Sequence, residues 1–263
     1  MSPKISLHPK FAAFVDVLFS LVLFFALRQM GAWWAVGVWF LVRALIWIGL
    51  IRLVYYPKEI SRLRHFFSLL VFAIGTTLLL LFIEWSISWQ VLAGVATLLS
   101  AGSFWLLPSI ESKLPFMPKP HRRWLLFLNM FGIAGIWSGV YAISAFHILY
   151  TVSMWVWMAT AGVLATVIAV WWWLEYGVEY SRRVLIWSVV WFLIMLEMGW
   201  AIMFLPLGFF ASGLFLTWFW YELWLLTRFN LSKEGINWRK QRTFVIINTL
   251  LMIAFLVFVV RWK

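Results

Sequence analysis

The sequence contains no cysteine and few charged residues. Its 263 residues include only nine Asp and Glu, and all charged residues together make up 11% of the chain. Without cysteine the chain has no disulfide, no thiolate metal site and no cysteine nucleophile. Soluble domains are about 25% charged, so a composition this poor in charge excludes an ordinary water-soluble fold.

Most residues of the chain are apolar. The chain is 65% hydrophobic and 21% aromatic, with 22 Trp residues. A single core of ordinary size cannot hide that much apolar surface, so we expect a multi-pass integral membrane protein. The formal net charge of +12 would suggest a nucleic-acid partner in a soluble protein. Here the cations stand beside apolar runs, which is typical of membrane orientation signals and lipid contacts instead.

Nine stretches are apolar and long enough to span a bilayer, which takes about 20 residues per helix. We therefore predict an all-α, polytopic transmembrane bundle built mostly from helical hairpins. The predicted spans are 11–27, 31–54, 66–83, 85–107, 124–146, 152–174, 184–205, 207–227 and 243–260.

The basic residues are distributed unevenly over the connections between these spans. If the connections alternate sides, seventeen of the 21 Lys and Arg residues fall on the side of the N-terminus. This bias predicts a protein of the inner (plasma) membrane with a cytoplasmic N-terminus and an extracytoplasmic C-terminus. The residues expected to contact anionic lipid head groups are Arg62, Arg64, Arg122, Arg123, Arg182, Arg183, Arg239, Lys240 and Arg242.

The domain prediction is one integral membrane domain over residues 1–263. The segment 108–123 holds four prolines and is typical of an irregular cytoplasmic linker, which would divide the domain into sub-bundles 1–107 and 124–263. Basic clusters also recur about every 60 residues before alternate spans. A duplicated hairpin would give this spacing, and so would any pair of spans with short loops.

Four charged residues lie well inside the predicted spans, away from their ends: Asp16, Arg43, Glu197 and Glu222. A charge at that depth costs several kcal/mol unless it is paired or reaches water. We expect an ion pair between Arg43 and Asp16, with Glu222 as a candidate third member. The four residues either form a proton or substrate relay, or they include a buried ion pair that fixes how the helices align.

Other residues in the spans predict helix packing. Asn129, Asn248 and Gln90 are expected to form hydrogen bonds between helices. Small residues from Gly132 to Gly139, and around Gly94 and Gly102, favour close helix contacts. The deep tryptophans Trp191, Trp218 and Trp220 are expected in the core, with an acyl-chain groove as the alternative.

No motif predicts an enzyme. The segment 135–139 has one residue too many for a Gly-x-Ser-Gly serine site, and we expect the four histidines one per loop. Glu175 and Glu179 precede Arg182 and Arg183 at helical spacing, which predicts an extension of the sixth span and not a two-carboxylate site. The sequence therefore predicts no enzyme activity, no metal site and no cofactor.

Three functional hypotheses follow. The first is a non-enzymatic membrane component or scaffold, whose partners are the bilayer, anionic head groups and other membrane proteins. The second is a small secondary transporter or lipid-handling protein that uses the four intramembrane charges. The third, with nothing positive to support it, is a membrane enzyme acting on a lipid.

Overall fold

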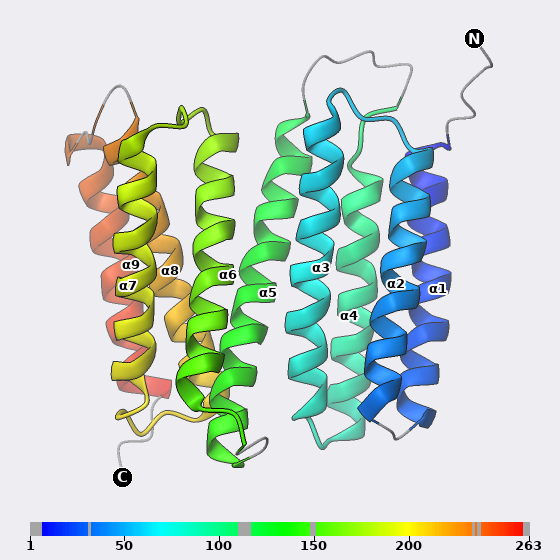
Figure 1. Ribbon diagram of the computed structural model, residues 1–263, viewed down its shortest axis with the longest axis horizontal. Helices are drawn as coiled ribbons and strands as arrows, with labels where there is room; N and C mark the ends of the chain where they lie inside the picture. Colours follow the sequence, from blue (N-terminus) through cyan, green and yellow to red (C-terminus); the bar gives the residue numbers. More distant parts are fainter. Residues whose placement is uncertain are drawn as a thin grey trace. The chain divides into compact units, whose positions relative to one another are not determined.

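The fold was analysed in a computed structural model, which describes residues 7–30, 33–109, 117–147, 151–232, 235 and 238–259. Within these ranges the chain forms nine α-helices and no strand (Figure 1). They are α1 (Pro9–Met30), α2 (Trp33–Leu53), α3 (Glu59–Leu81), α4 (Ser86–Trp105), α5 (Lys119–Ala145), α6 (Met154–Glu175), α7 (Arg182–Ile202), α8 (Phe209–Leu231) and α9 (Trp238–Val259). Each contains a segment long and apolar enough to cross a membrane. The predicted all-α class and the nine candidate spans are confirmed for these residues.

Three helices begin five or more residues before the apolar runs that predicted them. α3 starts at Glu59, α5 at Lys119 and α9 at Trp238, ahead of the predicted starts at 66, 124 and 243. An apolar run marks only the part of a helix that suits a bilayer, whereas backbone hydrogen bonding continues into polar residues. The basic residues that directly precede these three spans are therefore helical.

The predicted extension of the sixth span is wrong. α6 ends at Glu175, and Gly177 adopts a φ of 86°, which favours glycine. The amide of Val178 donates to the Trp173 carbonyl at 3.0 Å, and that of Gly177 donates to the Leu174 carbonyl at 3.2 Å. This pattern is a Schellman motif. It stops the helix, so Glu179 lies in the loop that follows.

By its internal contacts the chain divides into two compact units, Met1–Gly132 and Ile133–Lys263. The division lies inside α5, whereas the predicted joint was the linker 108–123, of which residues 110–116 are outside the described residues. The separation into sub-bundles 1–107 and 124–263 stays a prediction.

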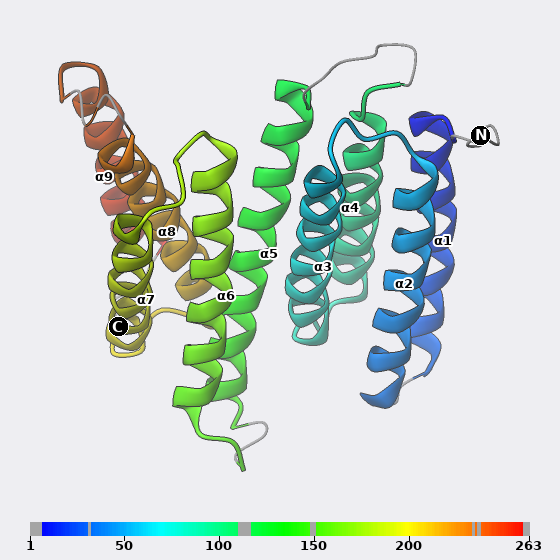
Figure 2. The same ribbon diagram turned by 45° about the horizontal axis from the view of Figure 1, so that its top comes forward.

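In the first unit, α1 to α4 form a four-helix arrangement. α1 packs against α2 and α4, and α3 packs against the same two helices (Figures 1 and 2). The first half of α5 contacts α3 very closely, because a Cβ atom added to Gly132 would lie 2.6 Å from the Val71 carbonyl oxygen. Asn129 Nδ2 donates to Ser68 Oγ at 2.9 Å, which confirms the hydrogen bond predicted for it between helices.

In the second unit, tryptophans from α6, α7 and α8 form the centre. Trp173, Trp191, Trp220 and Trp224 are at most 1% exposed. Trp191 meets Trp173 and Trp220 edge to face, with ring centroids 6.3 and 5.8 Å apart. The prediction that Trp191 and Trp220 pack in a core is confirmed.

The hydrogen bond predicted between Asn248 and another helix is not found among the described residues. Asn248 Nδ2 donates to the Phe244 carbonyl of its own helix α9 at 2.9 Å, in an exposed position. An asparagine can satisfy its amide on the preceding turn of its own helix. It therefore forms no hydrogen bond to another helix within the part of the chain that the structure describes.

Candidate functional site

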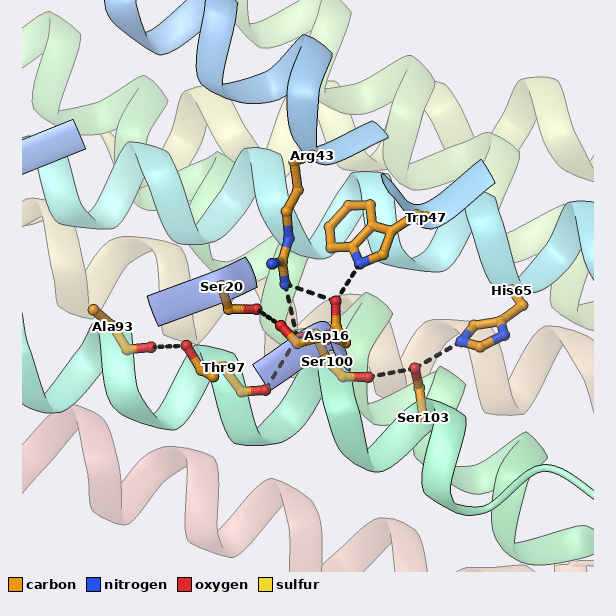
Figure 3. Close-up of polar contacts among 9 residues, drawn as sticks. All are labelled: Asp16, Ser20, Arg43, Trp47, His65, Ala93, Thr97, Ser100 and Ser103. Atoms are coloured by element: carbon orange, nitrogen blue, oxygen red, sulfur yellow. Dashed lines mark hydrogen bonds and ion pairs between the residues drawn. The ribbon is translucent and has the colours of Figure 1, made fainter. Parts of the chain in front are cut away.

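Asp16 of α1 and Arg43 of α2 meet inside the first unit. Arg43 Nη2 lies 3.3 Å from Asp16 Oδ1, and their side chains are 3% and 0% exposed. Figure 3 shows the guanidinium and the carboxylate pointing toward one another between the helices. The expected ion pair is present. Its role stays a prediction.

Both oxygens of Asp16 accept hydrogen bonds from neighbouring helices. Trp47 Nε1 of α2 donates to Oδ1 at 2.8 Å, and Ser100 Oγ of α4 donates to Oδ2 at 2.7 Å (Figure 3). A buried charge is tolerated when pairing and hydrogen bonds replace its hydration. The carboxylate of Asp16 is thus satisfied without solvent.

Arg43 is held by the same neighbours. Its Nη2 donates to Ser100 Oγ at 3.0 Å, and its Cζ lies 4.5 Å from the ring centroid of Trp47, a cation–π geometry. The cavity beside Arg43 has a volume of only about 10 Å³, which is close to the room that one water molecule needs. The surroundings of the ion pair are packed.

A second buried polar cluster lies toward the start of α3. The ring of His65, which is 0% exposed, contacts the Tyr56 hydroxyl at 2.5 Å through Nδ1 and Ser103 Oγ at 2.6 Å through Nε2. His121 at the start of α5 contacts the Ser103 carbonyl at 3.0 Å through Nδ1. The two histidine rings are 5.1 Å apart, edge to face.

The hydrogen-bond partners fix where the protons lie in this cluster. The Ser103 hydroxyl donates to the Ser100 carbonyl at 2.5 Å, so it accepts from His65 Nε2. Nδ1 of His65 then accepts a hydrogen bond from the Tyr56 hydroxyl. Burial raises the pKa of the Tyr56 phenol well above its ordinary value, because an apolar environment disfavours phenolate. Tyr56 is therefore a neutral donor at pH 7.

The two clusters join at Ser100, whose carbonyl accepts from Ser103 and whose hydroxyl donates to Asp16. We call the joined set the polar network. It draws residues from α1 to α5 and from the connection before α3, and it comprises Asp16, Arg43, Trp47, Tyr56, His65, Ser100, Ser103 and His121.

Most of the polar network was missed in the sequence. The expectation of one histidine per loop is wrong for His65 and His121, because both lie in the early turns of α3 and α5. One signal was available: Ser100 and Ser103 are three residues apart, which places two hydroxyls on one face of a helix. Nothing in the sequence pairs that face with Tyr56.

The other two predicted charges lie in the second unit. Glu197 is exposed on α7, and Glu222 is partly buried on α8. Glu222 Oε1 has no hydrogen-bond partner among the described residues. Since the two units are described separately, the expected link between Glu222 and the ion pair stays a prediction.

The predicted head-group residues share one structural feature: they lie within the first six residues of α3, α5, α7 or α9. α5, α7 and α9 have no acidic residue in the first turn. In α3, Arg62 lies 3.7 Å from Glu59. Cations are disfavoured at a helix N-terminus by the helix dipole, so helix stability does not explain their position. The residues are Arg62 and Arg64 in α3, Arg122 and Arg123 in α5, Arg182 and Arg183 in α7, and Arg239 and Arg242 in α9; the side chain of Lys240 is outside the described residues.

The described residues contain no group of three His, Asp or Glu side chains that could hold a metal ion. Comparison with known proteins adds no assignment, since the chain matches no protein-family model, no curated protein and no solved structure.

Proposed function

We propose that this protein is a multi-pass protein of the inner (plasma) membrane that acts as a non-enzymatic membrane component or scaffold. The observation that supports this most directly is the packing of the polar network. Asp16 is satisfied by donors from α2 and α4, and the cavity beside Arg43 is the size of one water molecule.

A transport pathway needs its charged residues to reach water or substrate. The Asp16–Arg43 pair is instead enclosed, and each of its partners comes from a different turn of a packed helix. A buried pair of this kind adds little net stability. Its main effect is to specify which helices pack together and how they are aligned along their axes. We therefore assign the pair the role of aligning α1, α2 and α4.

The basic helix starts support the membrane placement. Arg123, Arg182 and Arg239 are exposed at the N-termini of α5, α7 and α9, where the helix dipole disfavours them. Anionic head groups at the cytoplasmic surface would offset that cost. The partners proposed here are accordingly the bilayer and its anionic lipids.

The structural role is tested by a double-mutant cycle on the ion pair. Asp16→Asn and Arg43→Met each leave one buried charge unpaired, so each should lower the free energy of unfolding by about 3–5 kcal/mol. The double variant Asp16→Asn/Arg43→Met has no unpaired charge and should recover most of that loss. Unfolding in mixed detergent micelles measures all four proteins. Equal losses in the single and double variants would contradict the aligning role.

A second candidate function is proton-coupled transport. The observation in its favour is that the polar network runs without interruption from Asp16 to His65 and Tyr56. Vesicles carrying the protein and a pH-sensitive dye would report proton flux under an imposed gradient. Flux in the wild type that is lost in both the double variant and Glu197→Gln would replace the scaffold proposal. Flux equal to that of protein-free vesicles supports the scaffold.

A further inference from the structure

We propose that the second unit holds a binding site for a phosphate-type anion, supplied by the head group of an anionic membrane lipid. The site is the cavity between the α6–α7 connection and the end of α8. It is independent of the polar network and goes beyond the scaffold role, because it assigns one ligand class to one place.

The cavity has a volume of about 550 Å³, within the range of small-molecule sites. It is lined by both polar and apolar side chains, among them Tyr176, Glu179, Arg183, Val184, Arg228 and Phe229. The described lining residues include two arginines and one glutamate, so they carry one excess positive charge.

Arg228 is positioned as an anion ligand. Its Cζ lies 4.4 Å from the Tyr176 ring centroid and 5.3 Å from that of Phe229. No ion pair with another described residue involves Arg228. Stacking on aromatic faces fixes the plane of a guanidinium and leaves its N–H edges to bind a phosphate with two parallel hydrogen bonds.

Arg183 approaches from the adjoining helix. Its Nη2 donates to Asn230 Oδ1 at 3.1 Å, which ties the start of α7 to the end of α8. Ser181, the N-cap of α7, makes no side-chain capping bond and also lines the cavity. The first amides of α7 thus add to the positive potential that the two arginines supply.

The surroundings favour a lipid over free phosphate. The cavity lies at the ends of three helices that are each long and apolar enough to span a membrane, which is the level of lipid head groups. Val178, Val184 and Leu231 line the same cavity. An amphiphile can place its phosphate on the arginines and the first part of its acyl chains on these apolar side chains, whereas inorganic phosphate uses only the arginines.

The test measures lipid binding to purified protein by native mass spectrometry, with phosphatidylglycerol and phosphatidylcholine as probes. Arg183→Gln/Arg228→Gln should weaken phosphatidylglycerol binding about tenfold or more, since it removes two charge-assisted contacts, and should leave phosphatidylcholine unchanged. The control, matched to Arg183→Gln alone, is Arg182→Gln, which removes one positive charge from an exposed neighbour that is not among the lining residues. It should change binding by less than about twofold.

Further variants and probes test the site and its ligand. Arg228→Lys keeps the charge but loses the planar fork and the stacking, so it should bind phosphatidylglycerol less tightly than wild type. If Arg228→Gln does not fold, the variant Arg183→Gln, which changes an exposed residue, must still bind phosphatidylglycerol more weakly than Arg182→Gln does. Equal effects of Arg182→Gln and the double variant would overturn the site in favour of general surface charge. Binding of inorganic phosphate with no preference for phosphatidylglycerol would overturn the lipid assignment.

Discussion

Ser100 joins the two parts of the polar network. Its hydroxyl accepts from Arg43 and donates to Asp16, while its carbonyl accepts from Ser103. A small hydroxyl can serve both charges at once because it has one donor and two acceptor positions. The ion pair therefore depends on a neutral residue that carries no charge of its own.

This dependence gives a prediction for Ser100→Ala. The change leaves Asp16 Oδ2 without its donor and Arg43 without one acceptor, which should lower the free energy of unfolding by about 1.5–3 kcal/mol. Thr97→Val is the matched control one turn earlier on α4. Thr97 Oγ1 donates to the Ala93 carbonyl of its own helix, so its loss should cost less than about 1 kcal/mol. Chemical unfolding in micelles compares them, and similar losses in both would refute the role given to Ser100.

The same residues show how far the sequence could predict the site. Asp16 and Arg43 stand out because a charge is rare in an apolar span and must be satisfied there. Ser100, Ser103 and Tyr56 do not stand out, since hydroxyl groups are common in helices and cost much less free energy to bury than a charge does. Their importance comes from contacts between helices far apart in the chain, which a local pattern does not contain.

Among the helices, α3 and the first half of α5 come into direct backbone contact. A Cβ atom on Gly75 would collide with the backbone of Gly132, and one on Gly132 would collide with Val71. Such backbone contact is typical of small-residue packing between membrane helices, where van der Waals contact replaces the hydrophobic effect. The sequence predicted this behaviour for Gly132 but not its partner Gly75.

Two glycine substitutions test this contact between α3 and α5. Gly75→Ala requires α3 and α5 to separate and should lower the free energy of unfolding by about 1–3 kcal/mol. Gly94→Ala on α4 adds a methyl group where no atom lies within 4 Å, so it should be neutral or stabilise the helix by up to about 1 kcal/mol. Thermal unfolding in one detergent ranks the two. A Gly75→Ala protein as stable as Gly94→Ala would show that the contact is not close.

For the whole molecule, the sequence predicted the helices better than their arrangement. Each of the nine described helices overlaps one predicted span, because crossing a bilayer core requires a recognisable run of about 20 apolar residues. The division inside α5 was not predictable, since α5 is one continuous helix whose two halves contact different neighbours. Gly132 contacts α3, while the Tyr141 hydroxyl donates to the Gly199 carbonyl of α7 at 2.8 Å.

The orientation of the whole chain can be tested because it contains no cysteine. Ser153 precedes α6 and Ser181 precedes α7, and both are exposed. Successive connections of a multi-span protein lie on opposite sides, and the side rich in Lys and Arg is cytoplasmic. In intact cells, a membrane-impermeant maleimide should therefore label Ser153→Cys and label Ser181→Cys only after the membrane is permeabilised. Labelling of Ser181→Cys alone in intact cells would invert the topology, and would place the basic starts of α3, α5, α7 and α9 on the outer face.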